Sequence, residues 1–83
     1  MNLVPIPHCK RRMSQRNISW SEVSQVLYEH KRGVSFPSPD HPMRRVYTLS
    51  LERGSLCVVT QPAIEDTAPD GNVQVITVYY RDE

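Results

Sequence analysis

The chain has few of the features on which secreted and membrane proteins depend. Its 83 residues include only two cysteines, Cys9 and Cys57, and no apolar run approaches the roughly 20 residues that a bilayer span needs. One bridge is too few for the disulfide framework of a small secreted domain, and the N-terminus lacks the charged and then apolar regions of a secretory signal. We therefore expect a soluble cytoplasmic protein with free thiols and no membrane contact.

The short motifs of several enzyme classes are also missing. The sequence contains no glycine-rich phosphate loop, no Gly-x-Ser-x-Gly motif and no signature of paired catalytic carboxylates. The candidate metal ligands do not have the spacing of a zinc site; they are His8, Cys9, His30, His41 and Cys57. We therefore expect no metal and no cofactor, and the sequence disfavours nucleotide-cofactor and serine-hydrolase chemistry.

Charge is divided unevenly along the chain, although the net charge is only +1. Residues 1–53 hold 9 basic and 4 acidic side chains, whereas residues 54–83 hold 1 and 5. This asymmetry predicts that one side of the molecule meets a polyanion or an acidic partner. The length and the 39% content of hydrophobic residues allow one small domain, over residues 1–83, with a modest core.

Two helices are predicted in the first part of the chain, over residues 7–16 and 20–31. Proline is favoured at the start of a helix, as Pro7 would be here, and Asn17 can take the left-handed conformation that ends one. The Ser19–Glu22 sequence is the signature of a capping box at the start of the second helix.

Strand propensity is concentrated in the second half of the chain, in runs rich in valine, leucine and tyrosine. The predicted strands cover residues 2–6 (weakly), 44–51, 56–60 and 73–80, with a four-residue turn at 52–55 and loops at 34–42 and 61–72. The order β-α-α-β-β-β predicts an α+β fold, in which two helices pack on one face of a three- or four-stranded antiparallel sheet. We expect Trp20 and the valines of the second helix in the core.

A basic stripe on the first predicted helix is the main candidate site. His8, Arg12 and Arg16 recur at four-residue spacing, and Lys10 and Arg11 add to the positive charge. Two guanidinium groups can hold a phosphate while an imidazole transfers a proton near neutral pH. The pattern predicts a site for phosphodiester chemistry; the ordinary alternative is a solvated basic helix face.

Thr77 and Tyr79 share one face of the last predicted strand. If that face is open, the hydroxyls there can orient a phosphate or a ribose, and the tyrosine ring can stack on a base. If helices cover the face, the two residues belong to the core, and the sequence pattern leaves both possibilities open. The remaining candidates for contacts with the substrate are Lys10, Arg11, Arg44 and Arg45.

Several segments together resemble a known bacterial and phage family. The most specific part is the spacing of His8, the Arg12–Met13 pair and Arg16, and the resemblance covers nearly the whole chain. The matching segments are residues 7–19, 22–23, 26–27, 46–49, 56–59 and 75–79. In these segments the sequence is similar to the domain-of-unknown-function 4258 family, and more distantly to the RelE/ParE toxin superfamily and related small metal-independent ribonucleases. Asn17 stands where that family often has glycine.

The resemblance implies a RelE/ParE-like fold and a toxin that either cuts RNA, often on the ribosome, or binds DNA gyrase. In the nuclease branch the RNA 2′-hydroxyl attacks the adjacent phosphate and leaves a cyclic phosphate. His8 would be the general acid or base, Arg12 and Arg16 would stabilise the transition state, and Thr77 and Tyr79 would position the substrate. The implied partner is an antitoxin or immunity protein. The alternatives are a non-enzymatic module that binds a protein or nucleic acid, and a phage or plasmid accessory protein without activity.

Overall fold

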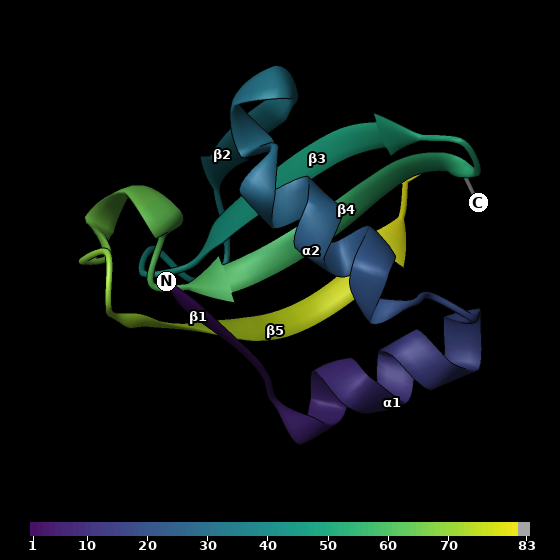
Figure 1. The fold of residues 1–83 in the computed structure, drawn as a ribbon, viewed down its shortest axis with the longest axis horizontal. Coiled ribbons are helices and arrows are strands. Elements are labelled where there is room, and N and C mark those ends of the chain that lie inside the picture. Colours follow the sequence, from purple (N-terminus) through teal and green to yellow (C-terminus); the bar gives the residue numbers. More distant parts are fainter. Residues whose placement is uncertain (82–83) are drawn as a thin grey trace.

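Two α-helices and a five-stranded sheet form the fold in the computed structural model, which describes residues 1–81 (Figure 1). The elements are β1 (Asn2–Pro5), α1 (Pro7–Arg16), α2 (Trp20–Tyr28), β2 (Val34–Pro37), β3 (Arg45–Leu51), β4 (Gly54–Gln61) and β5 (Asn72–Tyr80), with short 3-10 helices η1 (His30–Arg32) and η2 (Ile64–Asp66). The prediction of an α+β fold with two helices is confirmed. Neither helix within residues 1–81 is long and apolar enough to cross a membrane.

The sheet is mixed, so the prediction of an antiparallel sheet with three or four strands is wrong at both edges. The strand order is β1-β5-β4-β3-β2, and β1 runs parallel to β5, whereas the other three pairings are antiparallel. The second error concerns β2, which lies in the segment 34–42 that was predicted to be a loop. Both edge strands end in a proline, Pro5 in β1 and Pro37 in β2. Proline lacks a backbone N–H, and it is tolerated at an edge because an edge strand has no neighbour on one side that needs this donor.

The ends of the helices follow local chemistry that the sequence displays. Asn17 adopts φ 54° and ψ 46°, and its amide donates to the carbonyl oxygens of the last turn of α1. At the start of α2 the Ser19 hydroxyl accepts from the Glu22 amide at 3.1 Å, and the Glu22 carboxylate accepts from the Ser19 amide at 2.9 Å. The second helix ends at Tyr28 rather than at residue 31, because Glu29 leaves the helical region with φ −108° and ψ 23° and the chain continues as η1.

The connection between β3 and β4 is shorter than predicted. Gly54 already pairs with Leu51, and Ser55 with Ser50, so only Glu52 and Arg53 remain in the turn. Gly54 has φ 139°, a conformation that side chains with a Cβ rarely adopt, which explains why the turn needs glycine at this point.

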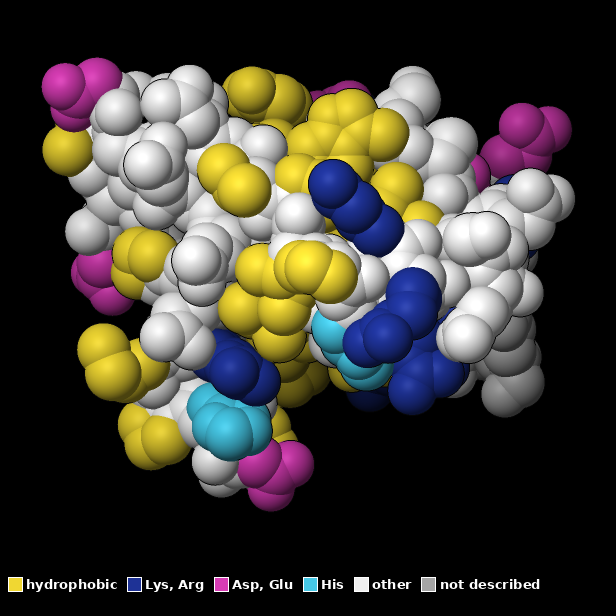
Figure 2. Space-filling view, turned by 90° about the horizontal axis from the view of Figure 1, so that it is seen from below, with side chains coloured by type: hydrophobic (Ala, Val, Ile, Leu, Met, Phe, Trp, Pro, Cys, Tyr) yellow, Lys and Arg dark blue, Asp and Glu magenta, His cyan; other side chains and the backbone are white. Residues whose placement is uncertain are grey.

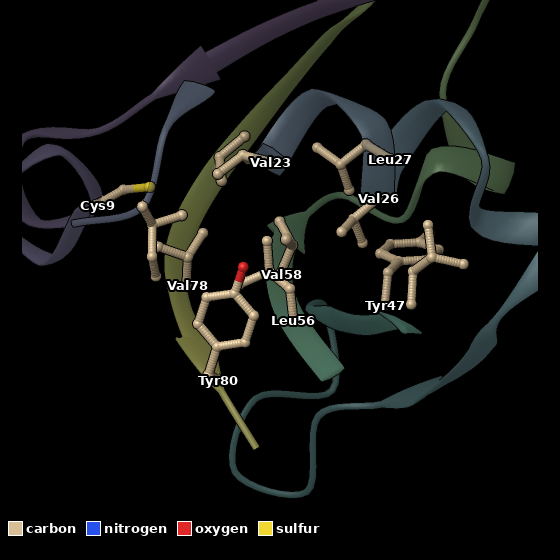
Figure 3. Close-up of a cluster of buried hydrophobic side chains, with 12 residues drawn as sticks. Cys9, Val23, Val26, Leu27, Tyr47, Leu56, Val58, Val78 and Tyr80 are labelled. Atoms are coloured by element: carbon tan, nitrogen blue, oxygen red, sulfur yellow. The ribbon is translucent and has the colours of Figure 1, made fainter. Parts of the chain in front are cut away.

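The main core lies between the helices and one face of the sheet (Figure 3). The helix α2 crosses β3 and β4, while α1 lies along β5 (Figure 1). The most deeply buried side chains in this layer are Cys9, Val23, Val26, Leu27, Tyr47, Leu56, Val58, Val75 and Val78. Trp20, which was expected in the core, is 37% exposed, because Val23, Val26 and Leu27 form the buried face of α2.

The opposite face of the sheet, here called the open face, carries a smaller buried cluster of Val46, Cys57, Val59 and Ile76. Within residues 1–81, no residue of α1 or α2 belongs to this cluster. The more exposed positions of this face carry hydroxyl groups and an aromatic ring; they are Ser50 of β3, Ser55 of β4, and Thr77 and Tyr79 of β5, while the Thr48 hydroxyl on the same face is buried. The open face therefore presents polar groups above an apolar layer.

Candidate functional site

The five residues assigned catalytic roles from the sequence lie around one hollow between α1 and β5. His8, Arg12 and Arg16 enter it from α1, whereas Thr77, Tyr79 and Tyr80 enter it from β5; the volume is about 390 Å³. Figure 2, in which α1 faces the viewer, shows Lys and Arg side chains gathered beside a histidine on this side of the molecule. The stripe with four-residue spacing thus faces a concave surface, and we call this hollow the α1 site.

Arg16 is the most firmly held of the three basic side chains. β1 pairs with β5 only as far as Pro5 opposite Val75, so the next part of the β5 edge faces α1. There the Arg16 guanidinium donates to the Val78 carbonyl oxygen at 3.0 Å. A guanidinium has five N–H groups, so this bond orients the side chain and leaves other donors for a ligand.

Arg12 and His8 are held less tightly. The Arg12 guanidinium donates to the side-chain oxygen of Gln15 at 3.2 Å, one turn along the same exposed helix face. The His8 imidazole is partly buried and has no hydrogen-bond partner within the described residues 1–81. A ligand in the α1 site would therefore meet one anchored guanidinium and two side chains that can still adjust.

The sequence pattern did not decide whether helices cover the face of the last strand that carries Thr77 and Tyr79. In the structure both residues lie on the open face. Both side chains are partly buried, and Tyr79 lies opposite Cys57 in the β4–β5 register. Burial, followed by the nearby Cys57 thiol, raises the pKa of the Tyr79 phenol above 10, although the Arg81 charge acts in the opposite direction. Tyr79 is therefore protonated at neutral pH and can donate a hydrogen bond.

The predicted substrate-binding residues divide between two regions. Arg11 lines a second, smaller hollow of about 280 Å³ on α1, together with His8, Arg12 and Gln15, and Lys10 is exposed on the same helix. These residues extend the positive surface around the α1 site.

Arg44 and Arg45 are not brought to the α1 site. The Arg44 guanidinium donates to Gln61 at 2.9 Å, and Arg45 forms an ion pair with Glu65 at 3.2 Å. Glu65 also accepts from the Tyr47 hydroxyl at 2.6 Å, so Arg45 helps to hold η2 against β3. In the structure these two arginines bind protein groups rather than extend the basic surface of α1.

A network beneath the α1 site was not predicted from the sequence. Arg53, in the β3–β4 turn, donates to the carbonyl oxygens of Asn17 at 2.6 Å and Arg16 at 3.2 Å and forms an ion pair with Glu22 at 3.4 Å. Its guanidinium lies 4.8 Å from the ring centroid of Tyr80, whose hydroxyl donates to Glu22. Positive charge is favourable at a helix C-terminus, and Arg53 places it at the end of α1.

This network also favours the ionised form of the Glu22 carboxyl group over its protonated form. The backbone hydrogen bond from Ser19 and then the hydrogen bond from Tyr80 lower the pKa of Glu22 below 4.5, and the positive charge of Arg53 contributes in the same direction. Partial burial opposes this shift but does not reverse it. The only local signal in the sequence was the capping box, which identifies Glu22 but not its distant partners Arg53 and Tyr80.

The chemistry of the α1 site is that of an anion-binding surface. None of its six lining residues is acidic, and they supply two guanidinium groups, an imidazole, two phenols and a hydroxyl. Comparisons of the chain with protein-family models, with curated proteins and with solved structures found no significant match.

Proposed function

We propose that the protein is a toxin-like, metal-independent RNA endonuclease that acts in the cytoplasm. The observation that carries the proposal is the α1 site, where His8, Arg12 and Arg16 meet three residues of the final strand in one hollow. Guanidinium pairs bind phosphate, and an imidazole is the side chain best suited to proton transfer near neutral pH. The basic first part of the chain is consistent with a polyanionic substrate.

In the proposed reaction the RNA 2′-hydroxyl attacks the adjacent phosphorus. The His8 imidazole accepts the proton of the 2′-hydroxyl as the new O–P bond forms, and the bond from phosphorus to the 5′-oxygen breaks. The leaving oxygen takes a proton from the imidazolium or from water, so the products are a 2′,3′-cyclic phosphate and a 5′-hydroxyl. Arg12 and Arg16 would stabilise the extra negative charge of the transition state.

Thr77 and Tyr79 would position the substrate in this reaction. The Tyr79 ring lines the same hollow as the two guanidinium groups, so it would stack on a base next to the scissile bond. The Thr77 hydroxyl can bind a phosphate or ribose oxygen. An antitoxin or immunity protein that covers the α1 site would be the natural partner of such an enzyme.

One observation favours a second candidate function, a non-enzymatic module that binds nucleic acid or a protein through the same basic helix. A catalytic histidine is usually oriented by a hydrogen bond to its second ring nitrogen, and His8 has no such partner within residues 1–81. In this alternative Arg12 and Arg16 contribute affinity and His8 has no chemical role.

Induced expression distinguishes the two candidates. Wild type, His8→Ala and the control His41→Ala, in which an exposed loop histidine is removed, are expressed in parallel, and total RNA is examined for new ends. The nuclease proposal predicts growth arrest and new 5′-hydroxyl ends with wild type and with His41→Ala, and neither effect with His8→Ala. Arrest by all three proteins without new RNA ends would contradict the nuclease and support the binding module.

A further inference from the structure

A second cationic hollow lies on the open face, apart from the α1 site. It has a volume of about 440 Å³, and its polar lining consists of Arg32 from η1, Thr48 and Ser50 from β3, Ser55 from β4, and Arg81. None of the lining residues within the described part of the chain, residues 1–81, is acidic, although Arg32 forms an ion pair with Glu29. Two guanidinium groups with hydroxyls between them suit a phosphate rather than a cation or an apolar ligand.

Strand register places this hollow beside the α1 site. Tyr79 of the α1 site pairs with Cys57, which in turn pairs with Thr48, so these residues form one row across the open face. Ser55 lies two positions from Cys57 along β4, and its carbonyl oxygen accepts from the Arg81 amide at 2.9 Å. The second hollow thus includes Thr48 from the row that contains Tyr79, and it extends along β4 to Ser55.

Polar side chains lie close together along β3 and β4, between Tyr79 and the far end of the second hollow. The Thr48 hydroxyl lies 3.3 Å from the Cys57 sulfur, and the hydroxyls of Ser50 and Ser55 lie 3.5 Å apart. Arg81 follows Tyr79 by two residues, so the arginine of one hollow is near the aromatic ring of the other, and its positive charge acts to lower the pKa of the Tyr79 phenol. Among the described residues 1–81 that line the two hollows, polar groups therefore extend from α1, across Tyr79, to Arg81, and none of these lining residues carries a carboxylate.

The dimensions match a short stretch of single-stranded nucleic acid. At ~3.3 Å per strand residue, the distance from Thr77 to Arg81 is about 13 Å. At ~3.4 Å per nucleotide of a stacked strand, this length corresponds to about four nucleotides. A positive surface with an aromatic ring between two phosphate-binding points is typical of proteins that bind single strands.

We propose that the open face binds single-stranded RNA, with the scissile phosphate in the α1 site, a base stacked on Tyr79 and a further phosphate in the hollow between Arg32 and Arg81. This inference rests on the proposed function and adds to it a substrate class, an unpaired RNA segment of at least about four nucleotides. A duplex is disfavoured because a paired and stacked base does not expose its face to Tyr79.

Binding of 2′-O-methyl RNA tests this proposal independently of cleavage, because the methyl group blocks the attacking hydroxyl. Fluorescence anisotropy is measured with a dinucleotide, a single-stranded octamer and the octamer duplex, for wild type, Arg81→Gln and the control Lys31→Gln. Arg81 and Lys31 are both exposed, and each variant loses one positive charge, but Lys31 does not line the hollow.

We expect Arg81→Gln to weaken binding of the single-stranded octamer by about fourfold near 0.15 M salt and to reduce the salt slope by about 0.7, the value for one phosphate contact. Dinucleotide binding should stay within error, Lys31→Gln should resemble wild type, and the duplex should bind more weakly than the single strand. Equal loss with dinucleotide and octamer, an equal loss with Lys31→Gln, or equal binding of the duplex would overturn the proposal. The predicted binding pattern without cleavage of all-ribose RNA, with ribosomes present as well as absent, would support this inference and refute the nuclease.

Discussion

The Arg16 guanidinium and the Val78 carbonyl oxygen, 3.0 Å apart, join α1 to the edge of β5 beyond the last pair with β1. This contact gives Arg16 two roles, since the same side chain lines the α1 site. Arg12 lines that site as well, but the only side-chain hydrogen bond of Arg12 within residues 1–81 is to Gln15 on its own helix. Arg16 therefore contributes to the stability of the fold as well as to the α1 site, whereas Arg12 contributes to the α1 site alone.

We predict different effects for Arg12→Ala and Arg16→Ala. Both changes should slow RNA cleavage, because each removes a guanidinium from the α1 site. Arg16→Ala should also lower the free energy of unfolding by about 1.5–3 kcal/mol, the usual effect of losing a charged hydrogen bond. Arg12→Ala should change it by less than about 0.5 kcal/mol, as is usual for a surface side chain. Urea unfolding and cleavage rates check this, and equal stability of the two variants would show that the Val78 contact contributes little.

Acid should destabilise the protein through Glu22. The pKa of Glu22 in the folded protein is lower than its ordinary value of 4.5, so its contribution to stability is present above that pH and is lost as the pH falls further. Glu22→Gln should therefore reduce the difference in unfolding free energy between pH 7 and pH 3. The matched control is Glu52→Gln, an exposed residue in the neighbouring turn. An unchanged pH dependence in Glu22→Gln would contradict the role given to the network of Arg53, Tyr80 and Ser19.

Gly33 allows the chain to pass directly against β3. A Cβ atom at this position would lie 2.0 Å from the Thr48 carbonyl oxygen, and this backbone oxygen cannot move without disturbing the pairing of β2 with β3. Gly33→Ala should therefore lower the unfolding free energy by about 3 kcal/mol, the upper range for overpacking. Thermal unfolding measures this, with Ser24→Ala on α2 as the control. A melting temperature within a degree of wild type would mean that β2 moves away from β3 easily.

Local signals in the sequence predicted the helices and the middle of the sheet well. The capping box of Ser19 and Glu22, the left-handed Asn17 and the valine-rich β5 depend on neighbouring residues, so they are visible without coordinates. The strand at residues 2–6 was predicted only weakly because of Pro5, and β2 was missed because the prolines of residues 34–42 favour a loop. Parallel pairing of β1 with β5 joins the two ends of the chain, and no local pattern specifies it.

The candidate site was predicted only in part, because only some of its residues are related by local spacing in the sequence. The spacing of His8, Arg12 and Arg16 places them on one side of a helix, and the structure brings that side to Thr77 and Tyr79. The positions of Arg53 and Arg81 depend on strand register, which sets where a turn or a strand end lies in space. Arg44 and Arg45 have the same charge as the α1 residues. Their acceptors are Gln61 at the end of β4 and Glu65 in η2, which the sequence predicted as part of a loop and so did not place.

The central claim is that the α1 site cleaves RNA through the 2′-hydroxyl, with His8 as the proton-transfer group. The direct measurement uses purified protein and an eight-nucleotide RNA, beside the same RNA with a single 2′-deoxy sugar at the cleavage position. We predict that wild type cuts only the all-ribose substrate and leaves a cyclic phosphate, and that His8→Asn lowers the rate at least about 100-fold while remaining folded. Cleavage of both substrates alike, a wild-type rate in folded His8→Asn, or no cleavage by wild type even with ribosomes present would contradict the claim.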